Sequence, residues 1–355
     1  AVSLLAAVVG GLRRAGVVWP APSGGVAIGQ AAAAHAALMM CGFLGTVIAI
    51  ERAVAIKLRS ALVAPAVSGL AGALMLGGHA EIAAWLWVFA GLVFVGVNVV
   101  VVLRQAAAHT VLLLVGALAW LTGNLVFAVG LEGSAVLPWW FAFLVLTVAA
   151  ERLEMTRLMR RHPVAQPSLH ATLLVMIVAA ALSAADPAVG GLAYGAALVA
   201  LAAWLGTFDI ARRTALAHGL SRYMAVCLLC GYVWLGIAGL AWGAMSLGLP
   251  TRDLALHALG LGFIFSMIMG HAPVILPAVA RVKLLIGPWF YAPLALLHGS
   301  LALRLLGGLA SAELRSIGAS LNAFALALFV LTVAGSALAW RLREVAMRTN
   351  IPPPR

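Results

Sequence analysis

The amino-acid sequence predicts an all-α integral membrane protein of about twelve transmembrane helices. Three observations lead to this fold class: apolar composition, the spacing of charged residues, and an internal repeat. Hydrophobic residues make up 65% of the 355 residues, charged residues only 9%, and the mean hydropathy is +1.11. Because soluble domains carry about a quarter charged residues, we expect one polytopic membrane domain, residues 1–355. Its helices are expected to form three pseudo-symmetric four-helix arcs, at approximately 1–105, 106–215 and 216–345.

Long apolar stretches bounded by charges, Gly and Pro mark the individual helices. A helix needs about 20 apolar residues to cross a bilayer. The first stretch is interrupted by Arg13 and Arg14, and no cleavable secretory signal is expected. The expected spans are 1–19, 29–50, 62–79, 81–103, 110–130, 135–155, 170–185, 188–208, 221–248, 254–280, 288–308 and 317–340.

Basic residues orient the bundle. With twelve spans, the loops after even-numbered spans and the C-terminal tail hold all but five of the 22 Lys and Arg residues. Loops rich in Lys and Arg stay in the cytoplasm, so both termini are expected there. The net charge of +12 follows from this loop distribution, and it gives no support to nucleic-acid binding. The five exceptions are Arg13, Arg14, Arg252, Arg304 and Arg315.

An internal repeat supports the three arcs. GFLGTVIAIERA (42–53), AFLVLTVAAERL (142–153) and GFIFSMIMGHAP (262–273) fall in the second, sixth and tenth spans, which are four helices apart. This register makes two sets of residues equivalent: Glu51, Glu151 and His271, and Phe43, Phe143 and Phe263.

Topology assigns a depth to each intramembrane histidine, because a helix rises about 1.5 Å per residue. The second and tenth spans run in the same direction, and His35 and His257 lie near their outer ends. His79 is expected at the same outer rim. His298 is expected near the middle of the membrane, and His271 in the inner half of the tenth span.

Histidines inside a membrane are costly and usually serve a purpose. One interpretation of His35 and His257 is a hydrogen bond from each ring to a neighbouring helix. The other is metal ligation, because an apolar environment favours the neutral imidazole that binds metals. Two imidazoles at equal depth that face each other across a gap are what a six-coordinate haem iron requires.

Two membrane-protein families resemble this sequence. Twelve helices with His35, Met39, Met40 and Phe43 in the second span resemble the catalytic subunit of haem–copper oxidases. The stretches HAALMMCGF (35–43) and HALGLGF (257–263) look closer to the NnrS family, membrane proteins associated with haem, copper and resistance to nitric oxide.

The resemblance implies one haem b held between His35 and His257, in a multi-pass protein of the bacterial inner (cytoplasmic) membrane. Met39, Phe43 and Phe263 would then pack beside the haem. His79 is the substitute ligand if His257 is a rim residue.

The sequence lacks the histidines that hold copper in the oxidases, so it excludes the oxidase copper site. The sixth span, PWWFAFLVLTVAAERLEM, has no histidine, and the seventh has only His170 at its edge, so oxygen reduction to water is not expected. His271 lies fourteen residues after His257, or about 21 Å along a helix, and the two cannot bind one iron. We expect His271 and His298 to form a weaker inner site for a second haem or a metal ion such as copper.

Other motifs have structural and functional interpretations. Glu51-Arg52 ends the second span as an interfacial ion pair, or Glu51 joins Glu151 and His271 in a cluster that passes protons. Pro273 and Pro277 should kink the tenth span, beside a cavity or as a simple bend. Cys227 and Cys230 are interpreted as small apolar residues.

Two classes of function fit these features. The first is a haem-bearing protein of electron transfer or nitric oxide handling, working with a soluble redox partner or other membrane subunits, and an oxidoreductase if it is an enzyme. The second is a transporter or metal permease whose histidines and tenth helix line a pathway. A purely structural subunit is the third alternative if no cofactor binds.

Overall fold

The structure, a computed structural model, describes residues 2–18, 25–131, 133–155 and 162–349, which are helical and contain no strand. The first half of the chain forms α1 (Val2–Arg14), α2 (Gly25–Ala33), α3 (His35–Ala37), η1 (Leu38–Gly45), α4 (Thr46–Ile56), η2 (Arg59–Leu62), α5 (Val63–Leu76), α6 (Ala80–Arg104), α7 (Ala108–Ala128), η3 (Gly133–Ala135) and α8 (Leu137–Met155). The second half forms α9 (Ala165–Ala185), α10 (Pro187–Phe208), α11 (Ala211–Thr214), α12 (Gly219–Ser246), α13 (Arg252–His257), η4 (Ala258–Phe265), α14 (Ser266–Ala280), η5 (Pro288–Phe290), α15 (Tyr291–Ala302), η6 (Leu303–Gly307), α16 (Gly308–Ala310) and α17 (Ala312–Thr349).

Eleven segments in the described part of the chain are long and apolar enough to cross a membrane. They correspond to the second to twelfth predicted spans, with ends shifted by up to six residues; the second, for example, is His35–Ile56 rather than 29–50. The predicted first span, 1–19, does not reach this length. Its helix α1 has 13 residues, about 20 Å at 1.5 Å per residue, which is shorter than the hydrocarbon core.

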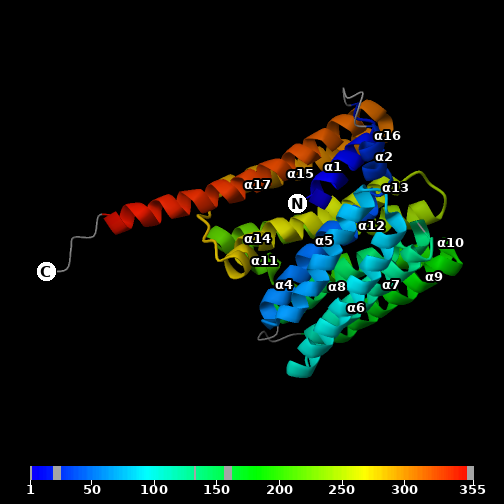
Figure 1. Cartoon of the computed structure of the whole chain (residues 1–355), viewed down its shortest axis with the longest axis horizontal. Coiled ribbons are helices and arrows are strands. Elements are labelled where there is room, and N and C mark those ends of the chain that lie inside the picture. Colours follow the sequence, from blue (N-terminus) through cyan, green and yellow to red (C-terminus); the bar gives the residue numbers. More distant parts are fainter. Residues whose placement is uncertain (1, 19–24, 132, 156–161, 350–355) are drawn as a thin grey trace.

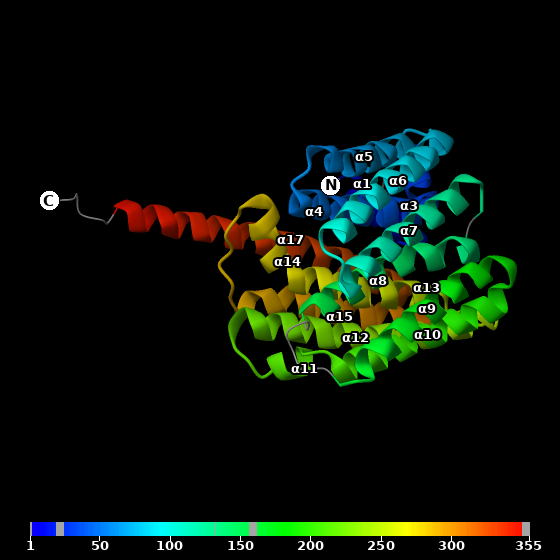
Figure 2. The same cartoon turned by 90° about the horizontal axis from the view of Figure 1, so that it is seen from below.

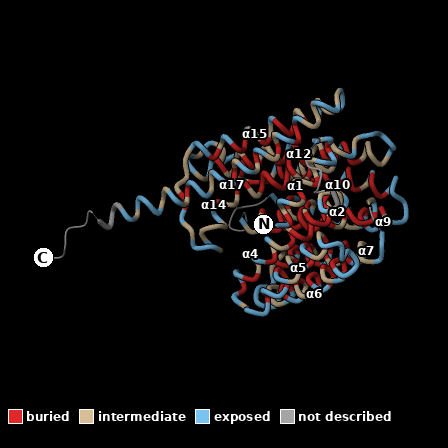
Figure 3. Tube along the Cα trace, turned by 45° about the horizontal axis from the view of Figure 1, so that its top comes forward, coloured by how far each residue is buried: buried red, intermediate tan, exposed pale blue. Residues whose placement is uncertain are grey.

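Helix α8 occupies the centre of the bundle. Figure 2 shows it between α5, α6 and α7 on one side and α9 and α10 on the other. The most apolar window of its span is 83% buried, which is the expected result for a helix that is apolar on all sides. Buried residues lie along the middle of the bundle in Figure 3, and the ends of the helices are exposed.

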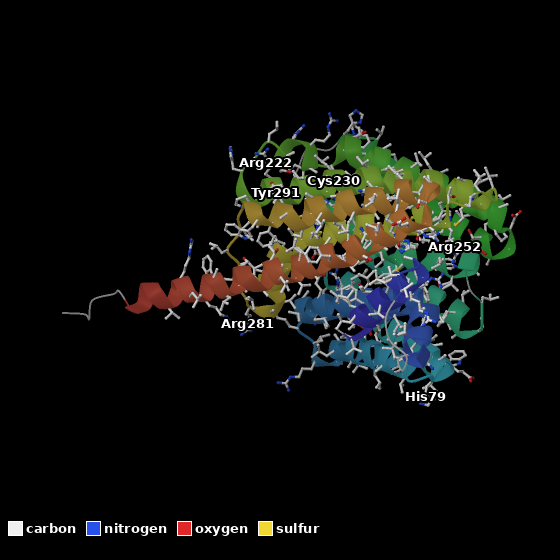
Figure 4. All side chains as sticks on the ribbon, turned by 90° about the horizontal axis from the view of Figure 1, so that it is seen from above. His79, Arg222, Cys230, Arg252, Arg281 and Tyr291 are labelled. Carbon is white, nitrogen blue, oxygen red and sulfur yellow. The ribbon has the colours of Figure 1, made fainter. Side chains whose placement is uncertain are left out.

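Neighbours in sequence pack as neighbours in space, and α1 closes the bundle by contacting both η1 and α17. Helix α17 is the longest, with 38 residues, and its end projects well beyond the other helices (Figure 1). Figure 4 separates the two ends of the bundle: His79 and Arg252 lie towards one end, and Arg222, Arg281 and Tyr291 towards the other.

Two long π-helical segments interrupt the second and tenth spans. Segment η1 covers Leu38–Gly45 and η4 covers Ala258–Phe265, eight residues each. These are equivalent positions in the register that aligns 42–53 with 262–273. Each segment is followed by a hydroxyl residue that donates to a glycine carbonyl, Thr46 to Gly42 and Ser266 to Gly262. The sixth span, α8, is a regular α-helix and has no such segment.

Helix α14 runs through Pro273 and Pro277 without interruption. The two prolines therefore do not end the helix, although each removes one backbone donor. The kink expected in the tenth span stays a prediction. The helix ends at Ala280, where Arg281 takes a left-handed conformation with φ 54°.

Candidate functional site: a histidine pair with acidic and basic partners

The structure brings His35 and His257 together at the start of the second and tenth spans. His35 opens α3 and His257 closes α13, so both lie within three residues of a π segment. Their ring centroids are 6.2 Å apart and the ring planes differ by 27°. Both residues are half-buried. Two residues that are 222 positions apart in the sequence thus lie next to each other at one end of the bundle.

Helix α1 fixes the ring of His35. Its Nδ1 lies 2.7 Å from the carbonyl oxygen of Ala7. Gly11, one turn further along α1, leaves space for the ring: a Cβ at this position would lie 2.8 Å from His35 Cε1. Because a carbonyl oxygen only accepts, the proton of the neutral ring is on Nδ1, and Nε2 carries the lone pair.

His257 is held by the carboxylate and the backbone of the residue four positions earlier. Its Nδ1 lies 2.9 Å from Asp253 Oδ1 and 3.1 Å from the Asp253 carbonyl oxygen. Arg304 from η6 donates Nη2 to Asp253 Oδ1 at 2.8 Å and Nε to Oδ2 at 3.1 Å. The proton of neutral His257 is therefore also on Nδ1, and the lone pair on Nε2.

This donor set fits a metal centre bound by two imidazoles. Metal-binding histidines usually donate their second ring N–H to a carboxylate or a backbone carbonyl, and both rings do so here. Since each nitrogen lies about 2 Å from a metal it binds, two rings on opposite sides of one ion have centroids roughly 6 Å apart, close to the distance observed. Arg304 Nη2 lies 3.1 Å from His257 Nε2, so a metal at this nitrogen requires a small movement of the guanidinium.

The predicted packing residues divide between two environments. Phe43 faces the tenth span, and its ring centroid lies 6.3 Å from that of Phe265. Phe263 is fully buried and lies against Gly231 of α12. Met39 is half-buried within η1. The equivalence of Phe43 and Phe263 in the repeat therefore does not place both rings between the two spans.

His271 belongs to a charged cluster, which we call the inner cluster: Glu51, Glu151, Arg152, Asp209 and His271. Arg152 and Asp209 are buried, and the other three residues are half-buried. Arg152 donates Nε to Asp209 Oδ2 at 2.8 Å, and its Nη1 lies 3.4 Å from His271 Nε2. Glu51 lies within electrostatic range of Glu151 and His271. The three residues that the repeat makes equivalent are thus close together, near the end of the bundle opposite the histidine pair.

His298 has different partners from His271. Trp234 donates Nε1 to His298 Nδ1 at 2.9 Å, and His298 Nε2 lies 3.5 Å from Ser266 Oγ. The lone pair of this imidazole is therefore used by the indole of α12. Within the described residues, no group of three or more His, Cys, Asp and Glu side chains is placed to hold a metal ion. An inner metal site of His271 and His298 stays a prediction.

Two residues of the histidine site were missed by the sequence argument, Asp253 and Arg304. The spacing of Asp253, four residues before His257, was a usable signal because such residues are neighbours on one helix face. Arg304 was visible as one of the few basic residues outside the loops predicted to be cytoplasmic. His79, the substitute ligand, is exposed at the start of α6.

Comparison with known proteins assigns the chain to a family. The model of a domain of unknown function, DUF8744, matches residues 1–338, so the chain belongs to this family. No curated protein and no solved structure matches the chain.

Proposed function

We propose that this DUF8744 protein binds one haem b through His35 and His257 and serves in electron transfer across or along a membrane. The observation that carries the proposal is the 6.2 Å spacing of two imidazoles whose Nδ1 atoms each face an acceptor. Such a pair leaves the Nε2 lone pair of His35 for iron, and that of His257 once the Arg304 guanidinium moves away from it. The resemblance of 35–43 and 257–263 to NnrS and oxidase helices points to the same cofactor.

His35 and His257 would together hold the haem, and a haem held by two histidines would supply one-electron transfer. Electron transfer is therefore better supported than direct binding of nitric oxide or another small gas. The role of the protein is to hold both rings, to keep the site at the outer end of the bundle, and to exclude water with the apolar second and tenth spans. A soluble redox partner or another membrane subunit would supply or take the electron.

The proposal also covers the number, the grouping and the orientation of the membrane spans. Helix α1 is taken as part of the first of twelve spans, the three arcs as a four-helix repeat, and both termini as cytoplasmic in a bacterial inner membrane. The matching positions of η1 and η4 support the repeat between the first and third arcs. All but five of the 22 Lys and Arg residues lie in the loops, the helix ends or the tail on one side of that topology, as the positive-inside rule requires.

A visible spectrum of the purified full chain tests the proposal. We expect sharp reduced-minus-oxidised bands of b-type haem, lost in both His35→Ala and His257→Ala. His298→Ala is the matched control, since that ring is tied to Trp234, and its bands should persist. A colourless, fully helical wild-type protein would contradict the proposal and favour the transporter or permease alternative.

The inner cluster supports a second function, uptake of protons from the cytoplasmic side. Glu51, Glu151 and His271 come from three different spans, and Glu51 lies within electrostatic range of the other two. Ionisable residues in membrane proteins commonly form proton relays. With a haem bound, these three side chains would pass a proton from the cytoplasmic side towards the membrane interior. In reconstituted vesicles, Glu51→Gln should slow this uptake at least several-fold, whereas an unchanged rate would leave Glu51 as a helix-end charge.

A further inference from the structure

We propose that Asp253 and Arg304 are positioning residues that set the electron donation of His257: Arg304 holds the Asp253 carboxylate, and the carboxylate holds the imidazole. The inference rests on the proposed function and adds which residues tune the bound iron. The first observation that supports it is a carboxylate oxygen of Asp253 that contacts both Arg304 and His257. Asp253 Oδ1 lies 2.8 Å from Arg304 Nη2 and 2.9 Å from His257 Nδ1, so one carboxylate oxygen links the two side chains.

The placement of Arg304 indicates a purpose for the ion pair. Only 7% of this residue is exposed, and a buried arginine inside a membrane helix is costly without a partner. The backbone of α17 packs tightly behind it, because a Cβ on Gly318 would lie 2.5 Å from Arg304 N. The two-bond contact with Asp253 fixes the guanidinium in one orientation. The carboxylate is consequently held in place by a guanidinium whose Nη2 also lies 3.3 Å from His257 Nδ1 and 3.1 Å from His257 Nε2.

The two imidazoles differ in their second partners. His35 donates to a neutral backbone carbonyl, and His257 donates to a carboxylate. A carboxylate makes the imidazole a stronger electron donor, which favours the oxidised iron over the reduced iron. Because of this difference, we expect the reduction potential to depend on the carboxylate partner of His257 more than on the carbonyl partner of His35.

Redox titration of the haem band in the purified full chain tests this role. Asp253→Asn should make the midpoint potential more positive and weaken haem binding by about 10-fold or more. Arg304→Gln should make the potential more negative, because the carboxylate loses its neutralising partner. The matched controls are Asp186→Asn and Arg252→Gln, two exposed charged residues whose changes should leave the potential unchanged. An unchanged potential in Asp253→Asn would overturn the inference while leaving haem binding intact.

A second measurement on haem-free protein separates this inference from the proposed function. In a double-mutant cycle of Asp253→Asn and His257→Gln, the shifts of the unfolding midpoint should be non-additive, because the two side chains are in contact. Additive shifts would overturn the contact whether or not haem binds. A wild-type protein without haem bands would refute the proposed function alone, and the cycle would still decide whether Asp253 holds His257.

Discussion

At the scale of single residues, the histidine site depends on small side chains as much as on the imidazoles. Gly11 lies beside the His35 ring, with no room for a Cβ. Glycine at this point lets α1 approach closely enough for Ala7 to accept the Nδ1 proton. The ring is therefore oriented by α1, a helix that contributes no ligand.

The change Gly11→Ala tests this dependence. The added methyl group would meet His35 Cε1 at 2.8 Å, so the ring must turn away from its acceptor. We expect haem affinity to fall several-fold, measured by titration of haem into the haem-free protein. Gly96→Ala is the control, because a Cβ there meets open space. Equal affinities in the two variants would show that α1 does not orient His35.

The buried ion pair of the inner cluster gives a prediction about stability. Arg152 and Asp209 are both buried and 2.8 Å apart. Asp209→Asn keeps the hydrogen bond to the backbone N–H of Ala211 but removes the charge. We expect the free energy of unfolding to fall by about 3 kcal/mol, measured by denaturant titration in detergent. The control is Asp186→Asn at an exposed position, which should change the free energy of unfolding by less than about 0.5 kcal/mol. A similar loss in both variants would contradict the assignment of Arg152 and Asp209 as a buried ion pair that stabilises the fold.

The sequence predicted the histidine pair but not its partners. His35 and His257 stood out because imidazoles are rare in apolar spans and because the topology placed them at equal depth. Arg304 could not be assigned to Asp253, since a linear sequence does not show which face of the eleventh span is turned towards the tenth. The lone pair of His298 is used by Trp234, and no sequence pattern shows which way an indole N–H points.

At the scale of secondary structure, the π segments were not predicted. Apolar runs such as 38–45 and 258–265 have the composition of any membrane helix. The extra residue that distinguishes a π-helical turn from an α-helical one leaves no signal in the composition. Glycines within these segments pack closely against neighbouring helices. Gly45 lies against the ring of Trp120 and Gly262 against that of Trp234, and π segments commonly mark functional sites.

Two glycines of η4 provide a matched test of this packing. A Cβ on Gly262 would lie 2.4 Å from Trp234 Cγ, whereas the nearest atom to a Cβ on Gly260 would be Phe141 Cε1 at 3.9 Å. Gly262→Ala should therefore lower the free energy of unfolding by about 1–3 kcal/mol through overpacking. Gly260→Ala should leave the free energy of unfolding nearly unchanged. Thermal unfolding of the two variants measures the difference. Equal effects would mean that α12 does not pack as closely on η4 as described.

At the scale of the whole molecule, composition and charge sufficed for an all-α membrane protein, because both follow from the cost of polar groups in lipid. Ten of the predicted spans have ends within five residues of the segments long and apolar enough to cross a membrane, and the second begins six residues later than expected. The central position of α8 was not predicted, since neighbouring membrane helices share similar apolar surfaces.

Labelling of single cysteines tests the orientation. In a background with Cys41, Cys227 and Cys230 replaced by alanine, Leu216→Cys and Leu249→Cys are placed at exposed positions, 86% and 55% accessible. An impermeant thiol reagent added to intact cells should label position 249 and spare position 216. The reverse pattern would invert the bundle and place the histidine pair at the cytoplasmic end.

The central claim, one iron shared by His35 and His257, is tested most directly by electron paramagnetic resonance of the oxidised full-length protein. The account predicts a low-spin ferric haem signal typical of two imidazole ligands, converted to high spin or lost in His35→Ala and in His257→Ala. A signal that survives unchanged in either variant, or a wild-type haem that is high spin, would contradict it.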